Sequence, residues 1–302
     1  MAYEEKPDED KAKKPKDSSK DADILRQALE DYDAAYEFQR GNIDDANEDL
    51  KFRRGRTEDQ WTPEAIAIRG DRPCLTINGI PQFIRQVTGD MRQMRPSIKV
   101  NPVDSRGDPK TAEVLAGLVR YVENRSFAKH IYTTAADSQV ACGIGHWQIT
   151  SEYAGTSTFN QELRIVGIED GVSVLWDPDS VLPTREDAMF CHVPFDISKR
   201  KFKKQYPDAP LEGFQYEFSH ANDGWYTGDS VRVTVYWVKK PIKRSLVLAP
   251  DGAIDDVTEQ TEGFTKAQLA DAAAFYEAQG YRFEQRDSFK VCRYLLTAGT
   301  VL

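Results

Sequence analysis

Apolar side chains recur at every third or fourth position between residues 72 and 100, RPCLTINGIPQFIRQVTGDMRQMRPSIKV. This spacing predicts an amphipathic helix, because residues three and four apart share one helix face. The apolar stripe consists of Ile80, Phe83, Ile84, Val87, Met91 and Met94. Asn78 is placed to cap the helix, and Arg95-Pro96 predicts its end, since a residue before proline avoids the α region. Short extended pieces are expected at 74–77 and 97–100.

Further helices are predicted in the first half of the chain. Residues 23–50 have a helical apolar period, with Gly41 as a candidate break between two helices. Asp108-Pro109 is a start signal for a helix that runs to about residue 124, because proline fits the first helical position. A helix at 127–140 follows, and its apolar period places Phe127 on the buried face.

From residue 144 the pattern changes to that of strands. Strands are predicted at 144–153, 159–168, 172–176, 231–239, 242–248 and 289–296. Asp251-Gly252 is a hairpin signal, and Thr265 with Gln268 forms a capping box that opens a helix to about residue 279. A short basic helix at 197–206 is expected behind an Asp196 cap. The predicted class is α+β, a helical N-terminal half packed with mostly antiparallel strands.

The charge along the chain divides it into parts. Residues 1–20 carry six Lys, six Asp or Glu and few apolar side chains, so a disordered tail is expected there. A mainly helical region at 21–140 and an α+β region at 141–302 follow. Residues 51–130 hold 15 basic and 9 acidic side chains, whereas the whole chain has a net charge of −9. An acidic whole argues against tight, general binding of nucleic acid, because phosphate contacts supply most of that affinity.

An acidic block directly precedes a basic cluster. The block contains Asp44, Asp45, Glu48 and Asp49, and the cluster contains Lys51, Arg53, Arg54 and Arg56. The cluster suits either DNA phosphates or an acidic protein surface. We favour pairing between subunits, in which the acidic block of one copy faces the basic cluster of the next, and keep DNA contact as the alternative.

Candidate chemistry is sparse. Asp177 and Asp179 could serve a Mg²⁺-dependent nucleic-acid-processing enzyme, but they lack the spacing of an EF-hand loop and an accompanying general base. Cys142 with His146, and Cys191 with His192, lack zinc-finger spacing. The sequence contains no G-x-S-x-G nucleophile motif, no phosphate loop and no apolar run of the length of a membrane span. The expectation is a non-enzyme with no cofactor, no metal and no membrane partner.

Several motifs follow one another in an order that carries a resemblance. They are EDQWTPEAI around Trp61, RPCLTIN, IRQVTGDMRQMRP, SIKVNPVD, VACGIGHWQITSEY, VLWDPDS and VRVTVYWVKKPIKRSLVL. The run from about residue 48 to residue 302 resembles portal proteins of short-tailed (podovirus-type) bacteriophages. Portal proteins of this type are longer, so the chain is expected to be their N-terminal portion.

The resemblance implies a subunit of a dodecameric ring at one capsid vertex, with a wing leading toward a stalk. Double-stranded DNA passes through such a ring during packaging by the terminase large subunit and during ejection. The major capsid protein, the scaffolding protein and tail or adaptor proteins are the other implied partners. The implied location is the virion, after assembly in the host cytoplasm. A different phage head–tail adaptor remains an alternative.

Within this resemblance, residues of the opening helix unit are expected to be structural. They are Trp61, Pro73, Asn78, Arg92, Arg95 and Pro96. The first two precede the amphipathic helix, and the others cap it, line it or end it. We expect them to fix this helix against neighbouring elements and subunits.

Overall fold

The computed structural model describes residues 18–94, 98–102, 108–209, 230–250, 252–261 and 263–302. Its helices are α1 (Ser18–Arg54), α2 (Thr57–Gln60), α3 (Pro63–Arg69), α4 (Ile80–Met94), α5 (Pro109–Arg125), α6 (Ala128–Cys142), α7 (Lys199–Gln205), α8 (Thr258–Thr261) and α9 (Lys266–Ala278). Its strands are β1 (Trp147–Tyr153), β2 (Gln161–Gly167), β3 (Leu175–Trp176), β4 (Phe190–Ser198), β5 (Ser230–Leu248), β6 (Ile254–Asp256) and β7 (Arg282–Leu296). Every strand pair in this part of the chain is antiparallel, which confirms the predicted α+β class.

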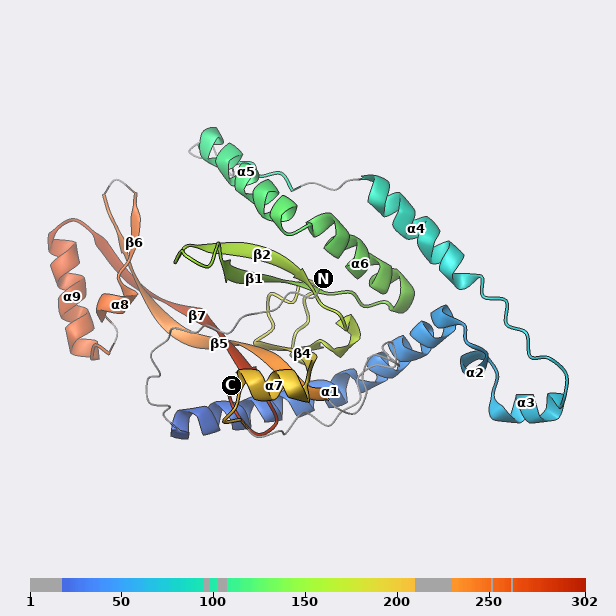
Figure 1. The fold of residues 1–302 in the computed structure, drawn as a ribbon. Coiled ribbons are helices and arrows are strands. Elements are labelled where there is room, and N and C mark those ends of the chain that lie inside the picture. The colour runs from blue at the N-terminus through green and yellow to red at the C-terminus, as the bar shows by residue number, and fades with distance from the viewer. Residues whose placement is uncertain (1–17, 95–97, 103–107, 210–229, 251, 262) are drawn as a thin grey trace.

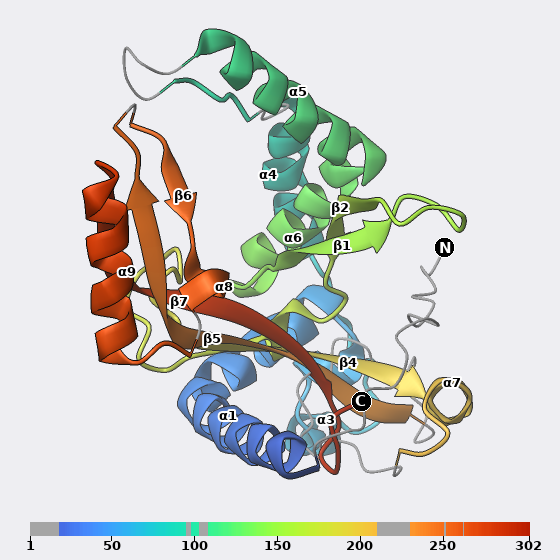
Figure 2. The same ribbon diagram turned by 90° about the vertical axis from the view of Figure 1, so that its left-hand side faces the viewer.

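Helix α1 is one continuous helix of 37 residues, so the predicted break at Gly41 is wrong. Glycine costs only about 1 kcal/mol in a helix interior, and packing on both sides of Gly41 offsets that cost. The helix buries one face against the sheet of β3, β4, β5 and β7, and it lies along that sheet (Figures 1 and 2). The predicted tail at 1–20 falls mostly outside the described residues, and α1 begins at Ser18.

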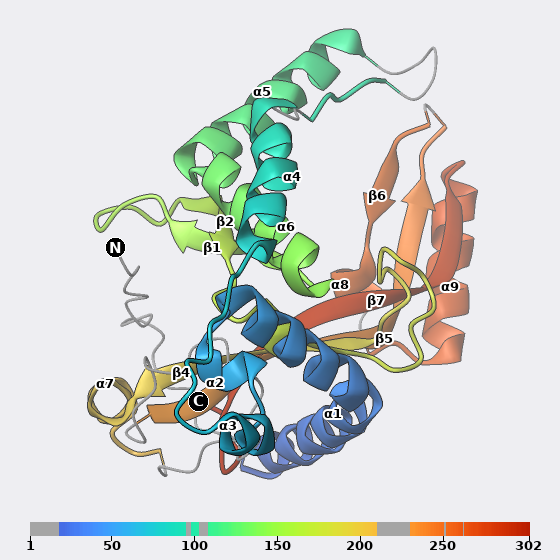
Figure 3. The same ribbon diagram turned by 90° about the vertical axis from the view of Figure 1, so that its right-hand side faces the viewer.

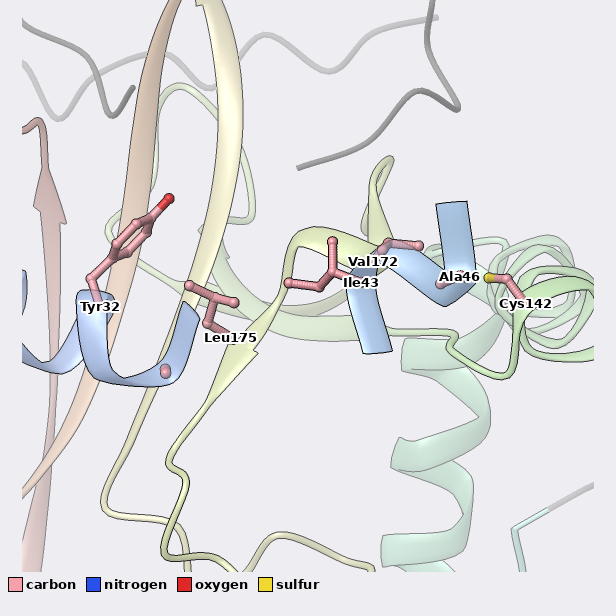
Figure 4. Packing of buried hydrophobic residues seen from close by; sticks show 7 residues of the cluster. Tyr32, Ile43, Ala46, Cys142, Val172 and Leu175 are labelled. Carbon is pink, nitrogen blue, oxygen red and sulfur yellow. The ribbon is translucent and has the colours of Figure 1, made fainter. Parts of the chain in front are cut away.

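The main core lies between α1, the segment that ends in β3, and the C-terminal end of α6. Tyr32 and Leu175 are fully buried at one end of this cluster, and Ala46 and Cys142 lie at the other (Figure 4). Ile43 bridges the two ends and is 3% exposed. The core therefore ties the first helix of the chain to elements more than a hundred residues later, and it fixes which face of α1 remains outside.

Strand β5 runs without interruption through Pro241, so the two strands predicted at 231–239 and 242–248 are one. Pairing with β4 ends at Val238, and pairing with β6 begins at Leu246. On one side of β5, Pro241 therefore has no neighbouring strand among the described residues, and on the other it lies opposite Phe289 of β7. A proline is tolerated in a strand at such a local edge, because its missing N–H leaves no partner unpaired.

Strand β4 was not predicted, and its presence corrects the expected cap of α7. Ser198 caps α7 by accepting a hydrogen bond from the backbone N–H of Lys201 at 3.3 Å. Asp196 instead lies within β4 and accepts two hydrogen bonds from Arg232 of β5, at 2.9 and 2.7 Å. The third predicted strand, at 172–176, is a 3-10 turn over Gly171–Ser173 followed by the two residues of β3.

Helices α5 and α6 cover the hairpin of β1 and β2 (Figure 1). Asp108 caps α5 as predicted, accepting from the backbone N–H of Lys110 at 3.0 Å, and these hydrogen bonds lower the pKa of its carboxyl. Phe127 was predicted to be buried, but it adopts a left-handed backbone conformation before α6 and is 74% exposed. The registers of β1 and β2 bear out the two predicted strands there.

The C-terminal part is a long twisted ribbon of β5 and β7, with α9 packed against its far end (Figure 2). Thr265 and Gln268 form the predicted capping box of α9. Gly280 follows that helix with φ of 83°, a left-handed conformation that favours glycine after a helix end. The hairpin of β5 and β6 forms as expected, although Asp251 of its turn lies outside the described residues.

Candidate subunit interface

The acidic block lies on the outer face of α1. Asp44, Asp45, Glu48 and Asp49 are all exposed, whereas Ile43, just before them, and Ala46, between them, are buried in the core. Because successive helical residues are rotated by about 100°, this alternation points the carboxylates away from the molecule. Among the described residues, no cation forms an ion pair with the block.

The basic cluster does not act as one unit. Arg53 forms an ion pair with Asp137 of α6, and Arg54 holds Asp59 of α2 through two hydrogen bonds of 3.0 and 3.2 Å. Arg56 lies 3.7 Å from Glu58 at the surface. Three of the four cations thus have acidic neighbours within the chain, and two of them, Arg53 and Arg54, fasten α1 to α6 and α2. Lys51 has no ion pair with another described residue.

The C-terminal end of α1 lies beside α4 and α6 (Figure 3). A pocket of about 790 Å³ opens between these three helices. Its lining residues are Leu50, Lys51, Arg53, Arg54, Pro81, Ile84, Arg85, Thr88, Arg92, Thr134 and Asp137. Five of them are cationic and one is a carboxylate. We refer to this feature as the basic pocket. Arg92 was expected to be structural and Arg85 was assigned no role, yet both line the pocket from α4.

The amphipathic stripe of α4 is mostly uncovered. Ile84 is 6% exposed and packs with Thr88 on the side of α6. The rest of the stripe is exposed: Ile80 42%, Phe83 69%, Val87 48%, Met91 41% and Met94 76%. Helix α4 therefore has three neighbouring faces: an exposed apolar strip, a buried strip in the middle, and the face that contributes arginines to the basic pocket. A contiguous exposed apolar surface of this kind is typical of a protein interaction site.

Asn78 joins two elements of the site. Its side-chain amide donates to the carbonyl of Arg53 at 2.8 Å, and its Oδ1 accepts from the backbone N–H of Ile80 at 3.2 Å. The second bond caps α4 as predicted. Gly55 lies directly against this side chain with φ of 64°, and a Cβ atom there would come within 2.2 Å of the Asn78 amide nitrogen.

Replacing Gly55 with alanine is therefore expected to destabilise the junction of α1 and α4. The left-handed backbone conformation at position 55 alone costs alanine about 1–2 kcal/mol, and the close contact with Asn78 adds to this cost. Gly41→Ala is the matched control: its Cβ would meet nothing within 4 Å, and it should stabilise α1 by about 0.5–1 kcal/mol. Urea unfolding of both variants measures the difference, and equal midpoints would contradict the role given to Gly55.

Trp61 and Pro73 share a partner that the sequence did not indicate. The guanidinium of Arg69 on α3 lies 5.0 Å from the centre of the Trp61 ring, and its Nε donates to the carbonyl of Pro73 at 3.0 Å. These contacts join α3 to the segments before and after it, and α3 lies beyond the C-terminal end of α1 (Figure 1). Arg95 and Pro96 lie outside the described residues. The extended piece at 74–77 pairs with no strand in the described part of the chain.

Asp177 has a structural role in its loop. Its two carboxylate oxygens accept from the backbone N–H groups of Asp179, at 3.0 Å, and Met189, at 2.7 Å. Asp187 similarly accepts from the Ser180 hydroxyl at 2.7 Å and from two backbone N–H groups, and these bonds hold the pKa of its carboxyl at about 2. Both carboxylates are thus engaged by the loop that leads from β3 to β4. Asp179 itself is exposed.

Of the residues considered for zinc, Cys142 and His146 form hydrogen bonds within the fold, and Cys191 and His192 are buried. His146 lies between the carbonyl of Gly171, 2.8 Å from Nδ1, and the indole N–H of Trp176, which donates to Nε2 at 3.1 Å. Burial lowers the pKa of this imidazole. In the described part of the chain, no three His, Cys, Asp or Glu side chains lie close enough together to hold a metal ion. Nor does any helix of that part have the length and apolarity to cross a membrane.

Comparison with known proteins identifies a family that the chain matches. The sequence model described as "Phage P22-like portal protein" matches residues 29–302. A curated relative, the "Portal protein" of Acyrthosiphon pisum secondary endosymbiont phage 1, is 24% identical over 176 residues. That alignment covers 56% of this chain and 24% of the relative's length. The family match extends from the first third of α1 through β7, so it includes the acidic block, the basic pocket and the exposed strip of α4.

Proposed function

The chain belongs to the phage P22-like portal protein family, and we propose that it is one subunit of the portal ring of a short-tailed, podovirus-type bacteriophage. The family match over residues 29–302 carries this proposal. In the proposed role the ring occupies one capsid vertex. Double-stranded DNA enters the capsid through it, leaves through it, and the tail attaches to it.

The exposed surfaces support an assembled rather than a solitary subunit. The apolar strip of α4 and the outward carboxylates of α1 lie on different elements of one chain. Surfaces that differ in this way can meet head to tail, and such contacts generate a closed ring when the rotation between copies closes. A dodecamer is the proposed ring.

The net negative charge of the chain suits a channel through which DNA slides. A net charge of −9 disfavours strong binding of phosphates along the whole chain. Each tight phosphate contact would have to break as the duplex slides, so a lining that repels more than it holds lowers the barrier to movement. In this proposal the subunit hydrolyses nothing, and the terminase large subunit supplies the work of packaging. The major capsid, scaffolding and tail or adaptor proteins are the further proposed partners.

Electron microscopy of the full-length protein tests this function. Purified protein is expected to form twelvefold rings with a central hole, because head-to-tail contacts close after a fixed rotation. The proposal is overturned if the protein stays monomeric at high concentration, or forms assemblies without a channel. A second measurement is the retention of packaged DNA by particles assembled with and without the protein, which should depend on it.

A further inference from the structure

We infer that the basic pocket between α1, α4 and α6 receives the acidic outer face of α1 from a neighbouring copy of the chain. This inference rests on the proposed function and names the residues of one subunit contact. It also revises the expected pairing, because most of the basic cluster of α1 is already engaged within the subunit.

The charge of the pocket is only partly balanced inside the chain. Arg53 and Arg54 are compensated by Asp137 and Asp59. Lys51, Arg85 and Arg92 also line the pocket, and the structure records no ion pair between these three and any other described residue. Three uncompensated cations around one concavity create a strongly positive site. Its ligand must bring several negative charges into a confined space.

The walls of the pocket favour a protein surface over nucleic acid. Leu50, Pro81 and Ile84 contribute apolar lining, and α4 also has the exposed strip with Phe83 and Val87 on the other side of its buried residues. A DNA duplex presents its phosphates on a convex, rigid backbone and has no apolar side chains to cover such a strip. Protein interfaces, in contrast, combine aromatic, Met and Arg side chains at their centre.

The outer face of α1 has the matching composition. Asp45 and Asp49 share this face with Phe38, which is 64% exposed, and with Phe52, which is 43% exposed. Steps of seven, four and three residues separate Phe38, Asp45, Asp49 and Phe52, so they form one stripe of the helix. The carboxylates fit the cations of the pocket, and the two phenyl rings fit its apolar lining, which includes Leu50 and Pro81.

The two surfaces cannot satisfy each other within one subunit. The carboxylates project from the side of α1 opposite to its buried residues, whereas the last turn of the same helix contributes other residues, Leu50, Lys51 and Arg53, to the lining of the basic pocket. The contact is therefore made between copies. It uses a different patch on each, which is the geometry of a ring.

A charge exchange tests the contact in the full-length protein. Arg85→Glu/Arg92→Glu reverses the pocket, and Asp45→Lys/Asp49→Lys reverses the face of α1. Each double variant alone should associate at least about a hundredfold more weakly than wild type, because like charges then face each other. Mixing the two variants should restore rings with alternating copies, since each face then meets a pocket of opposite charge. A dodecamer accommodates this alternation because its subunit number is even.

The controls separate this contact from folding and from the proposed function. Lys203→Glu/Lys204→Glu on α7 changes the net charge equally and should assemble like wild type, and circular dichroism should show every variant folded. A wild-type protein that forms no ring contradicts the proposed function. Wild-type rings with an unimpaired Arg85→Glu/Arg92→Glu variant, or variants that mixing fails to rescue, overturn the inference alone. Intact rings combined with lost binding of duplex DNA would assign the pocket to nucleic acid and also overturn it.

Discussion

Replacing Leu175 with alanine is expected to cost about 2–5 kcal/mol of the free energy of unfolding. Leu175 is fully buried in β3 and packs against α1 in the cluster that contains Tyr32 and Ile43 (Figure 4). Truncation removes apolar contacts and leaves a cavity that the long helix and the sheet cannot close. Much of the stability of a typical domain would be lost, because that stability is only about 5–15 kcal/mol.

The same substitution should weaken ring assembly, although Leu175 lies in no proposed contact. The cluster fixes the rotation of α1, and this rotation decides which way the acidic block faces. Leu175→Met is the volume-conserving control and should cost less than about 1.5 kcal/mol. Ile77→Ala, at a side chain 96% exposed, should change the free energy of unfolding by no more than about 0.5 kcal/mol. Urea unfolding and electron microscopy measure both effects, and a small cost for Leu175→Ala would contradict the assigned core.

The elements that the sequence predicted correctly are those with local signals. Asp108 and Pro109 open α5, and Thr265 with Gln268 opens α9, because a cap needs only residues within one turn. Strand β4 had no comparable signal. Its nine residues become a strand by pairing with β5, which lies more than thirty residues later in the chain.

Part of the site was also predictable. Arg85, Thr88 and Arg92 are spaced by three and four residues, so a shared face of α4 follows from the sequence. The pocket does not follow from the sequence, because it needs the end of α1 to lie beside α6. The ion pair between Arg53 and Asp137 that marks this junction joins residues 84 positions apart.

Periodicity also failed to predict what covers α4. The spacing of Phe83, Val87 and Met94 shows that they share a face, and that face is exposed in the single chain. An apolar period reports which side chains are grouped together and carries no information on whether the same chain or another copy covers them. Only the structure shows whether a helix with such a stripe is covered within its own chain or leaves the stripe exposed.

Acidification from pH 7 to pH 4 is expected to reduce the free energy of unfolding by about 3 kcal/mol through His192 alone. His192 is fully buried, and burial lowers the pKa of its imidazole to about 3. An unfolded histidine has a pKa of about 6.5. Between these two values the unfolded chain binds one more proton at this position than the folded chain. The contribution of neutral His192 to the free energy of unfolding is therefore fully present above pH 6.5, and it decreases as the pH falls toward 3.

The surroundings of His192 explain why its charged form is disfavoured. The ring stacks on Tyr236 of β5 at 4.6 Å between centroids, and the rings of Tyr32 and Phe190 lie edge-on at 5.2 and 5.9 Å. Nδ1 lies 3.5 Å from the Thr234 hydroxyl, and Nε2 has no hydrogen-bond partner among the described residues. No carboxylate is in contact to stabilise an imidazolium in this set of neighbours.

His192→Phe should therefore reduce the loss of unfolding free energy between pH 7 and pH 4, and it should retain the aromatic packing. Urea unfolding at pH 7 and pH 4 measures the slope, and wild type should lose about 3 kcal/mol more than the variant over this range. Asp31, whose pKa is raised by burial, opposes the trend in both proteins because it becomes protonated more readily when folded, so the comparison cancels its contribution. Phe190→Leu is the control, since it disturbs the same cluster but should keep the wild-type slope. Parallel curves for wild type and His192→Phe would show that another group sets the acid sensitivity, and would remove His192 as the residue that makes the α1–sheet core unstable to acid.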